Sequence, residues 1–263
     1  MGGRIFVAGK RLDILLVEGG IAENIEKARA LIGVGRVLVD GQPGIKAGSM
    51  YGADCTLELK PKKPYVGRGG EKLAAGLHSF GVNPRGLICA DIGCSTGGFT
   101  DCLLQHGAAR VYSVDVGYGV LDWKLRNDDR VVVLERTNAR FLTRDQIPEP
   151  IDLAVIDASF ISLALLFGPV GQLFAGDIQI IALVKPQFEL PKKKVPRGGV
   201  VKEEALHDEA LGMVCRYAEE AGLSCKGIIK SPIRGAKGNV EFLMHLAAMT
   251  DMNVKKPEKG EQY

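Results

Sequence analysis

The stretch Ile88–Asp101, with the sequence I-C-A-D-I-G-C-S-T-G-G-F-T-D, decides the fold of this chain. Its apolar beginning predicts a strand that ends at Asp91, and a helix is expected from Phe99 onward. The turn between them is rich in glycine, which lets a backbone approach a ligand closely, and the start of the helix offers backbone N–H donors. Together, the strand, the glycine turn and the helix start indicate a site for a nucleotide-type cofactor.

The spacing of these glycines narrows the choice of cofactor. The pattern G-x-x-x-G-G is neither the G-x-G-x-x-G of dinucleotide sites nor a P-loop, which ends in Gly-Lys-Ser/Thr. An acid before the first glycine suits a cofactor that carries an amino-acid cation, as S-adenosylmethionine (SAM) does. Spacing alone favours SAM and leaves NAD open. The predicted cofactor contacts of this stretch are Asp91, Gly93, Ser95, Thr96, Gly97, Gly98 and Phe99.

A second acid supports a nucleotide site. Residues 110–114 predict the next strand, and Asp115 follows it directly. About 20 residues separate the glycine turn from this acid, and at that separation a carboxylate binds the ribose in Rossmann-like folds. We therefore expect Asp115 to bind the ribose hydroxyls of the cofactor.

Length and composition are those of a globular protein. The chain has 263 residues, of which 46% are hydrophobic and 25% are charged, enough for one large domain or for a large and a small one. No apolar run approaches the roughly 18 residues of a membrane span, and the N-terminal apolar segment is too short for a signal peptide. None of the six cysteines forms a C-x-x-C pair, so we expect no metal site and a cytoplasmic location.

The N-terminal quarter of the chain differs from the rest in charge and in pattern. Residues 1–72 contain 12 Lys and Arg against 8 Asp and Glu, an excess that favours an anionic partner. Apolar spacing predicts two helices, the second capped by Asn24, followed by two short strands. These elements are expected over residues 10–18, 25–32, 36–40 and 56–60.

This N-terminal module resembles the S4 RNA-binding domain. The resemblance rests on the pattern R-L-D-x-L-L-V-E-x-G followed by K-A-R-x-L-I-x-x-G-x-V-x-V-D-G. In that family the second helix and the turn after it present cations to structured RNA, which implies phosphate contacts that position the RNA rather than read its bases. A solvated helix face is the alternative for such cations. The candidate RNA contacts are Arg11, Lys27, Arg29 and Arg36.

From residue 87 onward, apolar strands alternate with helical segments. This alternation predicts a mostly parallel sheet covered on both faces by helices. The last two strands are separated by a short loop and are expected to pair as an antiparallel hairpin. The expected strands cover residues 87–91, 110–115, 131–135, 151–157, 178–185, 226–231 and 239–247.

Four charged residues lie where a ligand of such a sheet is expected. Asp157 and Lys185 directly follow apolar strands, Glu241 alternates with apolar residues of the last strand, and Lys72 lies on the helix before the first strand. A charge beside a buried strand is costly unless it reaches water, a partner or a ligand, and ligands of α/β sheets lie at the carboxyl ends of the strands. A ribose hydroxyl needs a base and stabilising charges before it accepts a methyl group, and these four residues could supply both.

The chain resembles the TlyA (hemolysin A-like) family of ribosomal RNA methyltransferases over roughly residues 10–248. The resemblance rests on the ordered motifs G-R-G-G-E-K-L, D-I-G-C-S-T-G-G-F-T-D, T-N-A-R-F-L, V-I-D-A-S-F-I-S-L, A-L-V-K-P-Q-F-E and K-G-N-V-E-F-L. It implies an α/β Rossmann-like, SAM-dependent methyltransferase fold of the FtsJ type with a mostly parallel seven-stranded sheet, preceded by a small α+β S4 domain. The expected domains are residues 4–62 and 63–249, followed by a polar tail over 250–263.

The same resemblance implies the activity and the roles of the site residues. The implied reaction is 2′-O-methylation of a cytidine in ribosomal RNA, with ribosomal RNA or ribosomal subunits as the partner. Asp91 is placed at the methionine end of SAM, Asp115 at the ribose and Asn138 at the adenine, and Asp157 also counts among the cofactor contacts. The implied catalytic tetrad is Lys72, Asp157, Lys185 and Glu241.

Two positions depart from the family pattern, since Gly67 replaces a serine and Cys94 replaces an alanine.

Three other functions compete with methyl transfer. The matched charges argue against a non-catalytic S4 assembly factor, and the absence of an apolar span or a strongly basic amphipathic helix argues against a membrane-active haemolysin. The glycine pattern argues against an NAD-dependent oxidoreductase. The modified nucleotide, the ribosomal subunit, the lysine that acts as base and the oligomeric state stay open.

Overall fold

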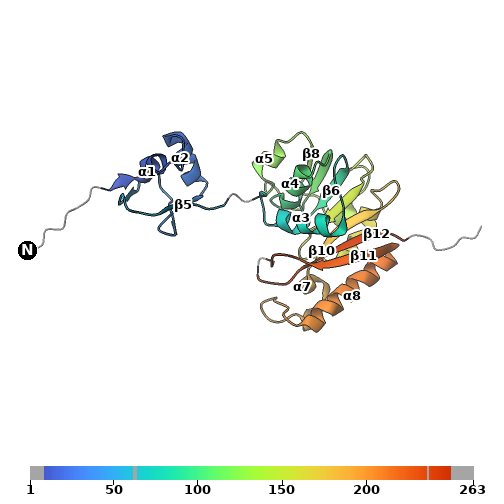
Figure 1. Ribbon diagram of the computed structural model, residues 1–263. Coiled ribbons are helices and arrows are strands. Elements are labelled where there is room, and N and C mark those ends of the chain that lie inside the picture. The colour runs from blue at the N-terminus through green and yellow to red at the C-terminus, as the bar shows by residue number, and fades with distance from the viewer. Residues whose placement is uncertain (1–8, 62–63, 236, 250–263) are drawn as a thin grey trace, which may run out of the picture. The chain divides into compact units, whose positions relative to one another are not determined.

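The computed structural model describes the chain over residues 9–61, 64–235 and 237–249. Contacts divide the chain into two compact units, of which the first ends at residue 63 and the second begins at residue 64 (Figure 1). The expected domain boundary at 62–63 and the expected tail over 250–263 lie outside the described residues, as do residues 4–8.

The first unit packs two helices against short strands. β2 pairs antiparallel with both β3 and β5, and β1 pairs antiparallel with β4. Apolar side chains of α1, α2 and β2 form its core, with Leu12, Leu16 and Ala28 fully buried. The elements are β1 (Lys10–Arg11), α1 (Leu12–Glu18), α2 (Ile25–Gly33), β2 (Val37–Val39), β3 (Gln42–Pro43), β4 (Met50–Tyr51) and β5 (Leu57–Leu59).

The start of the first helix differs from the expectation. Residues 10 and 11 do not begin the helix but form the strand β1, because their backbone pairs with Met50 and Tyr51. Apolar spacing cannot detect a strand whose partner lies so far along the chain. The predicted cap of the second helix is confirmed, since Asn24 Oδ1 accepts a hydrogen bond from the N–H of Lys27 at 2.9 Å.

The second unit contains one seven-stranded sheet with the strand order β11-β12-β10-β9-β6-β7-β8. β12 runs antiparallel to both of its neighbours, and the other neighbouring strands of this sheet pair parallel. The mostly parallel seven-stranded sheet and its final antiparallel hairpin are therefore confirmed. The strands are β6 (Ile88–Ile92), β7 (Arg110–Val114), β8 (Val131–Leu134), β9 (Leu153–Ile156), β10 (Gln179–Val184), β11 (Leu223–Lys230) and β12 (Phe242–Ala248).

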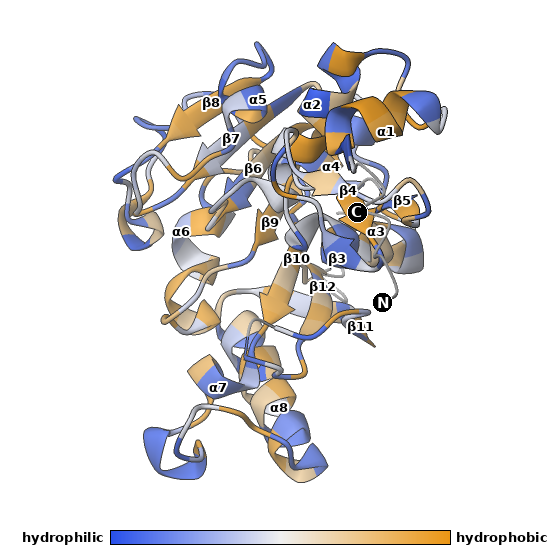
Figure 2. Ribbon diagram, turned by 90° about the vertical axis from the view of Figure 1, so that its left-hand side faces the viewer, coloured by the Kyte–Doolittle hydropathy of each residue, from blue (hydrophilic) through white to orange (hydrophobic). Residues whose placement is uncertain are grey.

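Helices cover both faces of this sheet, as Figure 1 shows. One face carries a core with α3, α4 and α5, and the other carries a core with η2, α6 and α8. Both cores draw on apolar strand residues, and β9, in the middle of the sheet, is coloured as apolar in Figure 2. The helices are α3 (Gly69–Phe80), α4 (Gly98–Gln105), α5 (Trp123–Arg126), η1 (Ala139–Phe141), η2 (Leu163–Leu165), α6 (Phe167–Gly171), α7 (Pro186–Glu189), η3 (Lys192–Lys194) and α8 (Glu204–Glu220).

The strand order changes direction between β6 and β9. Chain connections run outward from β6 through β7 to β8 on one side, and from β9 to β10 on the other. In open α/β sheets such a switch point leaves a crevice at the carboxyl ends of the strands, and ligands bind there. Across the described ranges, none of the helices is at once long enough and apolar enough to cross a membrane.

Candidate active site

The strand ends around the switch point bring the predicted site residues to one edge of the sheet. Gly93 follows β6, Asp157 follows β9 and Lys185 follows β10. Glu241 directly precedes β12 rather than lying within the strand as expected. Because β12 is antiparallel, with Phe242 opposite Val184, its beginning lies at the same edge as the ends of the parallel strands.

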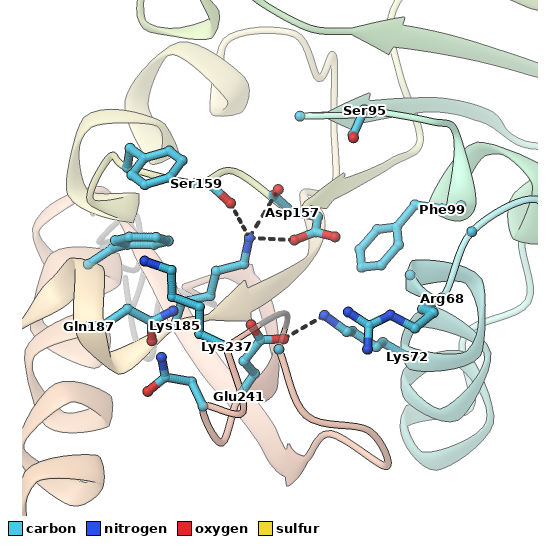
Figure 3. Close-up of a pocket in the computed structure, with 18 of the residues that line it drawn as sticks. Arg68, Lys72, Ser95, Phe99, Asp157, Ser159, Lys185, Gln187, Lys237 and Glu241 are labelled. Carbon is cyan, nitrogen blue, oxygen red and sulfur yellow. Dashed lines mark hydrogen bonds and ion pairs between the residues drawn. The ribbon is translucent and has the colours of Figure 1, made fainter. Parts of the chain in front are cut away.

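These strand ends open into a pocket of about 640 Å³, shown in Figure 3. It brings the four expected catalytic residues together with most of the glycine turn. Asp91, Gly97, Asp115 and Asn138 are not part of its lining. The predicted residues that line it are Lys72, Gly93, Ser95, Thr96, Gly98, Phe99, Asp157, Lys185 and Glu241.

Lys185 is surrounded by oxygen atoms. Its Nζ lies 2.7 Å from Asp157 Oδ1 and donates to Ser159 Oγ at 2.8 Å. The backbone carbonyls of Ala158 and Asp157 lie at 3.0 and 3.3 Å from the same nitrogen. These contacts fix the ammonium group at the pocket wall although the side chain is almost completely buried.

Lys72 forms the second ion pair of the pocket. Its Nζ lies 2.5 Å from Glu241 Oε2, and both side chains are buried. A cation in the first turn of a helix opposes the helix dipole, so α3 gains nothing from Lys72 at this position. The carboxylate of Glu241 compensates for the burial of the lysine. The pocket therefore contains two buried lysines, each beside one carboxylate.

Asp91 fits the amino group of a bound cofactor. Its side chain is fully buried, Oδ2 accepts a hydrogen bond from Thr100 Oγ1 at 2.6 Å, and Oδ1 has no partner. Burial raises the pKa of Asp91 to about 7, while the hydrogen bond from Thr100 opposes this shift. A buried carboxylate oxygen without a partner is costly. The ammonium group of a methionine moiety would satisfy it.

The glycine turn fits a cofactor that approaches the backbone. Gly93 has φ +85°, and a Cβ there would lie 2.9 Å from the carbonyl oxygen of Asp157. Gly97 has φ +94° and precedes α4 without a side-chain cap, so the first N–H groups of α4 are available to a ligand. Both positions require glycine. The turn thus provides the close approach and the donors that a cofactor carboxylate needs.

Asp115 and Asn138 lie on neighbouring loops at the same edge. Asp115 accepts the N–H groups of Ser95 at 2.8 Å and Gly117 at 2.7 Å, and each of its oxygens keeps a second lone pair for a ribose hydroxyl. Asn138 caps η1, its Oδ1 accepting the N–H of Arg140 at 3.1 Å. The N–H of Thr137, next to Asn138, donates to the carbonyl of Asp115.

Sequence reasoning missed two neighbours of Asp157. Ser159 supplies a hydroxyl to Lys185, and Phe160 lines the pocket with 90% of its surface exposed and φ +63°. Phe160 also contacts Phe188, with ring centroids 5.0 Å apart. A left-handed backbone is a strained conformation for a bulky residue and is found preferentially at functional sites. The signal in the sequence was an aromatic residue in the loop that follows β9, close to the predicted site residue Asp157.

The candidate RNA contacts of the first unit separate into two groups. Arg11 forms a bidentate pair with the buried Asp13 at 2.9 and 2.7 Å, and Arg29 Nε donates to Asp13 Oδ2 at 3.0 Å. The hydrogen bond from Arg11 holds the pKa of Asp13 well below its usual range. Arg36 instead donates to the carbonyl of Lys60, and Lys27 is exposed on α2. The structure therefore joins Arg11 and Arg29 and leaves Arg36 in a different contact.

No metal centre is found in the part of the chain that the structure describes: no group of three or more His, Cys, Asp or Glu residues there could hold an ion.

Known proteins with similar sequences share this architecture. The model of the FtsJ-like methyltransferase family matches residues 65–248, and that of the S4 domain matches residues 10–43. The 16S/23S rRNA (cytidine-2′-O)-methyltransferase TlyA of Mycobacterium tuberculosis is 44% identical over 243 residues, which cover 92% of this chain and 91% of that protein. Hemolysin A of Brachyspira hyodysenteriae is 38% identical over 89% of this chain and 98% of its own length.

A solved structure from Streptococcus thermophilus that carries the name hemolysin is 40% identical, with a TM-score of 0.70 over 92% of this chain and 89% of that one. The sequence and structural matches therefore extend over both units. The expected resemblance is confirmed: the chain belongs to the TlyA (hemolysin A-like) family of SAM-dependent methyltransferases, in which an S4 domain precedes an FtsJ-like methyltransferase domain.

Proposed function

We propose that this protein transfers a methyl group from SAM to the ribose 2′-hydroxyl of a cytidine in ribosomal RNA. The observation that carries the proposal is the shared pocket: two buried lysines, each paired with a carboxylate, and most of the glycine turn line one cavity. The names of relatives of similar length support the choice of ribosomal RNA and of cytidine.

SAM supplies an electrophilic methyl group when it is bound. Asp91 would hold its ammonium group, the N–H groups at the start of α4 its carboxylate, Asp115 its ribose and Asn138 its adenine. The unpartnered oxygen of Asp91 and the glycine turn beside Asp157 support this placement. These contacts leave the cavity next to Phe99, Lys72 and Lys185 for the target nucleotide.

The two lysines activate the target hydroxyl. A ribose 2′-hydroxyl has a pKa far above neutral, so the lysine that takes up its proton has to be in the neutral amine form, having released its own proton to solvent beforehand, while the other lysine, still charged, stabilises the developing alkoxide. Lys185 or Lys72 can be the acceptor of the proton. Asp157 orients Lys185 through a contact of 2.7 Å, and Glu241 orients Lys72 through a contact of 2.5 Å.

Phe160 provides the face on which the target base stacks. An exposed aromatic side chain at the rim of a pocket offers a surface to any nucleobase, and such stacking contributes about 1–3 kcal/mol per base. Its exposure and its place in the pocket lining support this role. A target nucleotide that leaves its helical stack to place its 2′-hydroxyl inside the cavity would regain a stacking partner on this ring.

The S4 unit binds the RNA outside the pocket. Arg11 and Arg29 are held at one buried carboxylate but keep roughly half of their side-chain surface exposed, as phosphate contacts require. Lys27 and Arg36 are further candidates on the same unit. These contacts position the ribosomal RNA without selecting its sequence.

The test is methyl transfer from labelled SAM to purified ribosomal subunits. We expect label in RNA with the wild-type protein and none with Lys185→Ala, while Lys192→Ala, which changes an exposed lysine of η3, keeps full activity. A thermal melt with SAM shows that each variant is folded and binds its cofactor. Full activity of Lys185→Ala would refute the catalytic assignment. No label with a SAM-binding wild-type protein would favour a non-catalytic assembly factor.

A further inference from the structure

We propose that Glu189 is a positioning residue that fixes the loop over residues 158–162, and with it Phe160, at the rim of the active site. The inference rests on the proposed function, because the base stacked on Phe160 belongs to the RNA substrate. Glu189 is not among the residues that line the pocket. It therefore acts through the loop and not on the reacting atoms.

The carboxylate of Glu189 binds the far end of this loop. Glu189 is buried in α7, its Oε2 accepts a hydrogen bond from Ser162 Oγ at 2.6 Å, and its Oε1 accepts one from the N–H of Leu163 at 3.1 Å. Ser162 Oγ also accepts the N–H of Ala164 and so caps η2. Both carboxylate oxygens of Glu189 therefore accept hydrogen bonds from Ser162 and Leu163, the two residues where the loop ends.

The near end of the loop is bound by the same short segment of chain. Lys185, four residues before Glu189, contacts Asp157, the carbonyl of Ala158 and Ser159 Oγ. Between these two charged residues, the ring of Phe188 packs against Phe160 at an angle of 47°. One segment of five residues therefore contacts the loop at its start, at its aromatic residue and at its end.

The conformation of Phe160 explains why such contacts are needed. Its φ of +63° is unfavourable for a bulky side chain, and its exposed ring buries little apolar surface in exchange. Such a conformation persists only when the surrounding structure fixes the backbone on both sides. Lys185 fixes one side and Glu189 the other. Without Glu189, the loop is expected to relax and to present Phe160 in several orientations.

The activity test compares Glu189→Ala, Glu189→Gln and Phe160→Ala with the wild-type protein. We expect kcat/KM for ribosomal RNA to fall about tenfold in Glu189→Ala and in Phe160→Ala, the loss of one stacked base, with an unchanged KM for SAM. Glu189→Gln keeps one acceptor oxygen and recovers most of the loss. The double variant Glu189→Ala with Phe160→Ala should be no slower than Phe160→Ala alone, because both changes remove the same stacking surface. Losses that multiply in the double variant, or a parallel loss of SAM binding, overturn the proposal.

A second measurement does not depend on methyl transfer. Hydrogen exchange of the Leu163 amide reports the loop directly, since this N–H donates to Glu189. We expect exchange to accelerate at least tenfold in Glu189→Ala and in Ser162→Ala, while amides of β9 keep their rates. Unchanged exchange at Leu163 in a folded Glu189→Ala protein overturns the proposal. A wild-type protein without RNA methylation but with this exchange pattern would contradict the proposed function and retain the positioning role.

Discussion

At Asp13 of the S4 unit the acid is buried and its two cations are exposed, whereas in the pocket of the methyltransferase unit the lysine of each ion pair is buried. Asp13 is 1% exposed, while its partners Arg11 and Arg29 are 44% and 58% exposed. In the pocket, the side chains of Lys185 and Lys72 are only 8% and 10% exposed. The two units thus use the same chemical pair in two different environments.

The difference is the one expected if each cation acts where we propose. A guanidinium group that binds a phosphate of a large RNA has to remain at the surface, and a buried acid can fix its direction without covering it. A lysine that acts on a hydroxyl has to lie inside a pocket from which water is largely excluded, where its charge interacts strongly with the reacting group. If the proposed roles hold, burial of the cation distinguishes the proposed catalytic pairs from the proposed docking pairs in this chain.

The largest effect is expected from Lys72. We expect Lys72→Met to lower the rate of methyl transfer by about 10²–10⁴-fold, the usual contribution of a general acid–base group. The single change also leaves the buried Glu241 unpaired, which destabilises a protein by about 3–5 kcal/mol. Methyl transfer under single-turnover conditions and a chemical denaturation curve measure the two effects separately.

The double variant Lys72→Met with Glu241→Gln is the matched control for stability. It removes both charges of the pair, so most of the lost stability should return while activity stays low. Recovery of methyl transfer together with stability would show that the pair in the pocket serves structure alone. The contrast between the two units would then disappear.

Asp91 extends the comparison to a buried acid that pairs with no cation among the residues that the structure describes. Burial raises its pKa to about 7, so the folded state binds a proton that the unfolded state releases near pH 4. The contribution of this group to stability therefore falls as pH rises from about 4 to about 7. The ammonium group of the cofactor favours the ionised form of Asp91. SAM affinity should therefore rise about tenfold between roughly pH 5.5 and pH 7.

Calorimetric titration with SAM at several pH values measures this dependence. Asp91→Asn keeps the shape of the side chain and removes its charge, so its SAM affinity should be low and should not vary with pH in this range. Asp101→Asn serves as the comparison, since it changes a buried acid of α4 whose carboxylate already contacts Lys124 and the N–H of Val66. An equal pH dependence in wild type and Asp91→Asn would assign the cofactor ammonium to another residue.

Replacing Asp13 tests whether this acid orients Arg11 and Arg29, because orientation and net charge predict opposite changes in RNA affinity. Asp13→Asn raises the positive charge of the S4 unit, so simple electrostatics predicts tighter RNA binding. If Asp13 fixes the directions of Arg11 and Arg29, affinity should instead fall several-fold because the guanidinium groups lose their orientation. Glu18→Gln makes the same charge change at the exposed pair with Lys10 and should not weaken binding. Tighter binding of both variants to ribosomal RNA would refute the orienting role.

The sequence predicted those features that depend on local pattern. The strand before Asp91, the glycine turn and the alternation of strands and helices follow from spacing, and strand ends placed Asp157 and Lys185 at the pocket edge. Contacts made by tertiary packing could not be predicted in this way. The meeting of Arg29 with Asp13 depends on how α1 packs on α2, and the contacts of Glu189 with the loop after Asp157 depend on two strands lying side by side.

The smallest effect distinguishes arginines within the S4 unit. Arg29→Ala should weaken binding to ribosomal RNA. It should also reduce the steepness of the plot of log affinity against log salt by roughly 0.7–0.9, so that affinity falls about threefold less than in the wild type between roughly 50 and 200 mM salt. Arg36 donates two hydrogen bonds to the carbonyl of Lys60, so part of its role is within the unit and its replacement should change the slope less. Arg216→Ala on α8 removes an exposed arginine of the other unit and controls for net charge. Equal salt dependence of RNA binding in all three variants would show that an exposed arginine beside a buried acid is not thereby a phosphate contact. The proposed role of Arg11 and Arg29 in binding RNA would then be wrong.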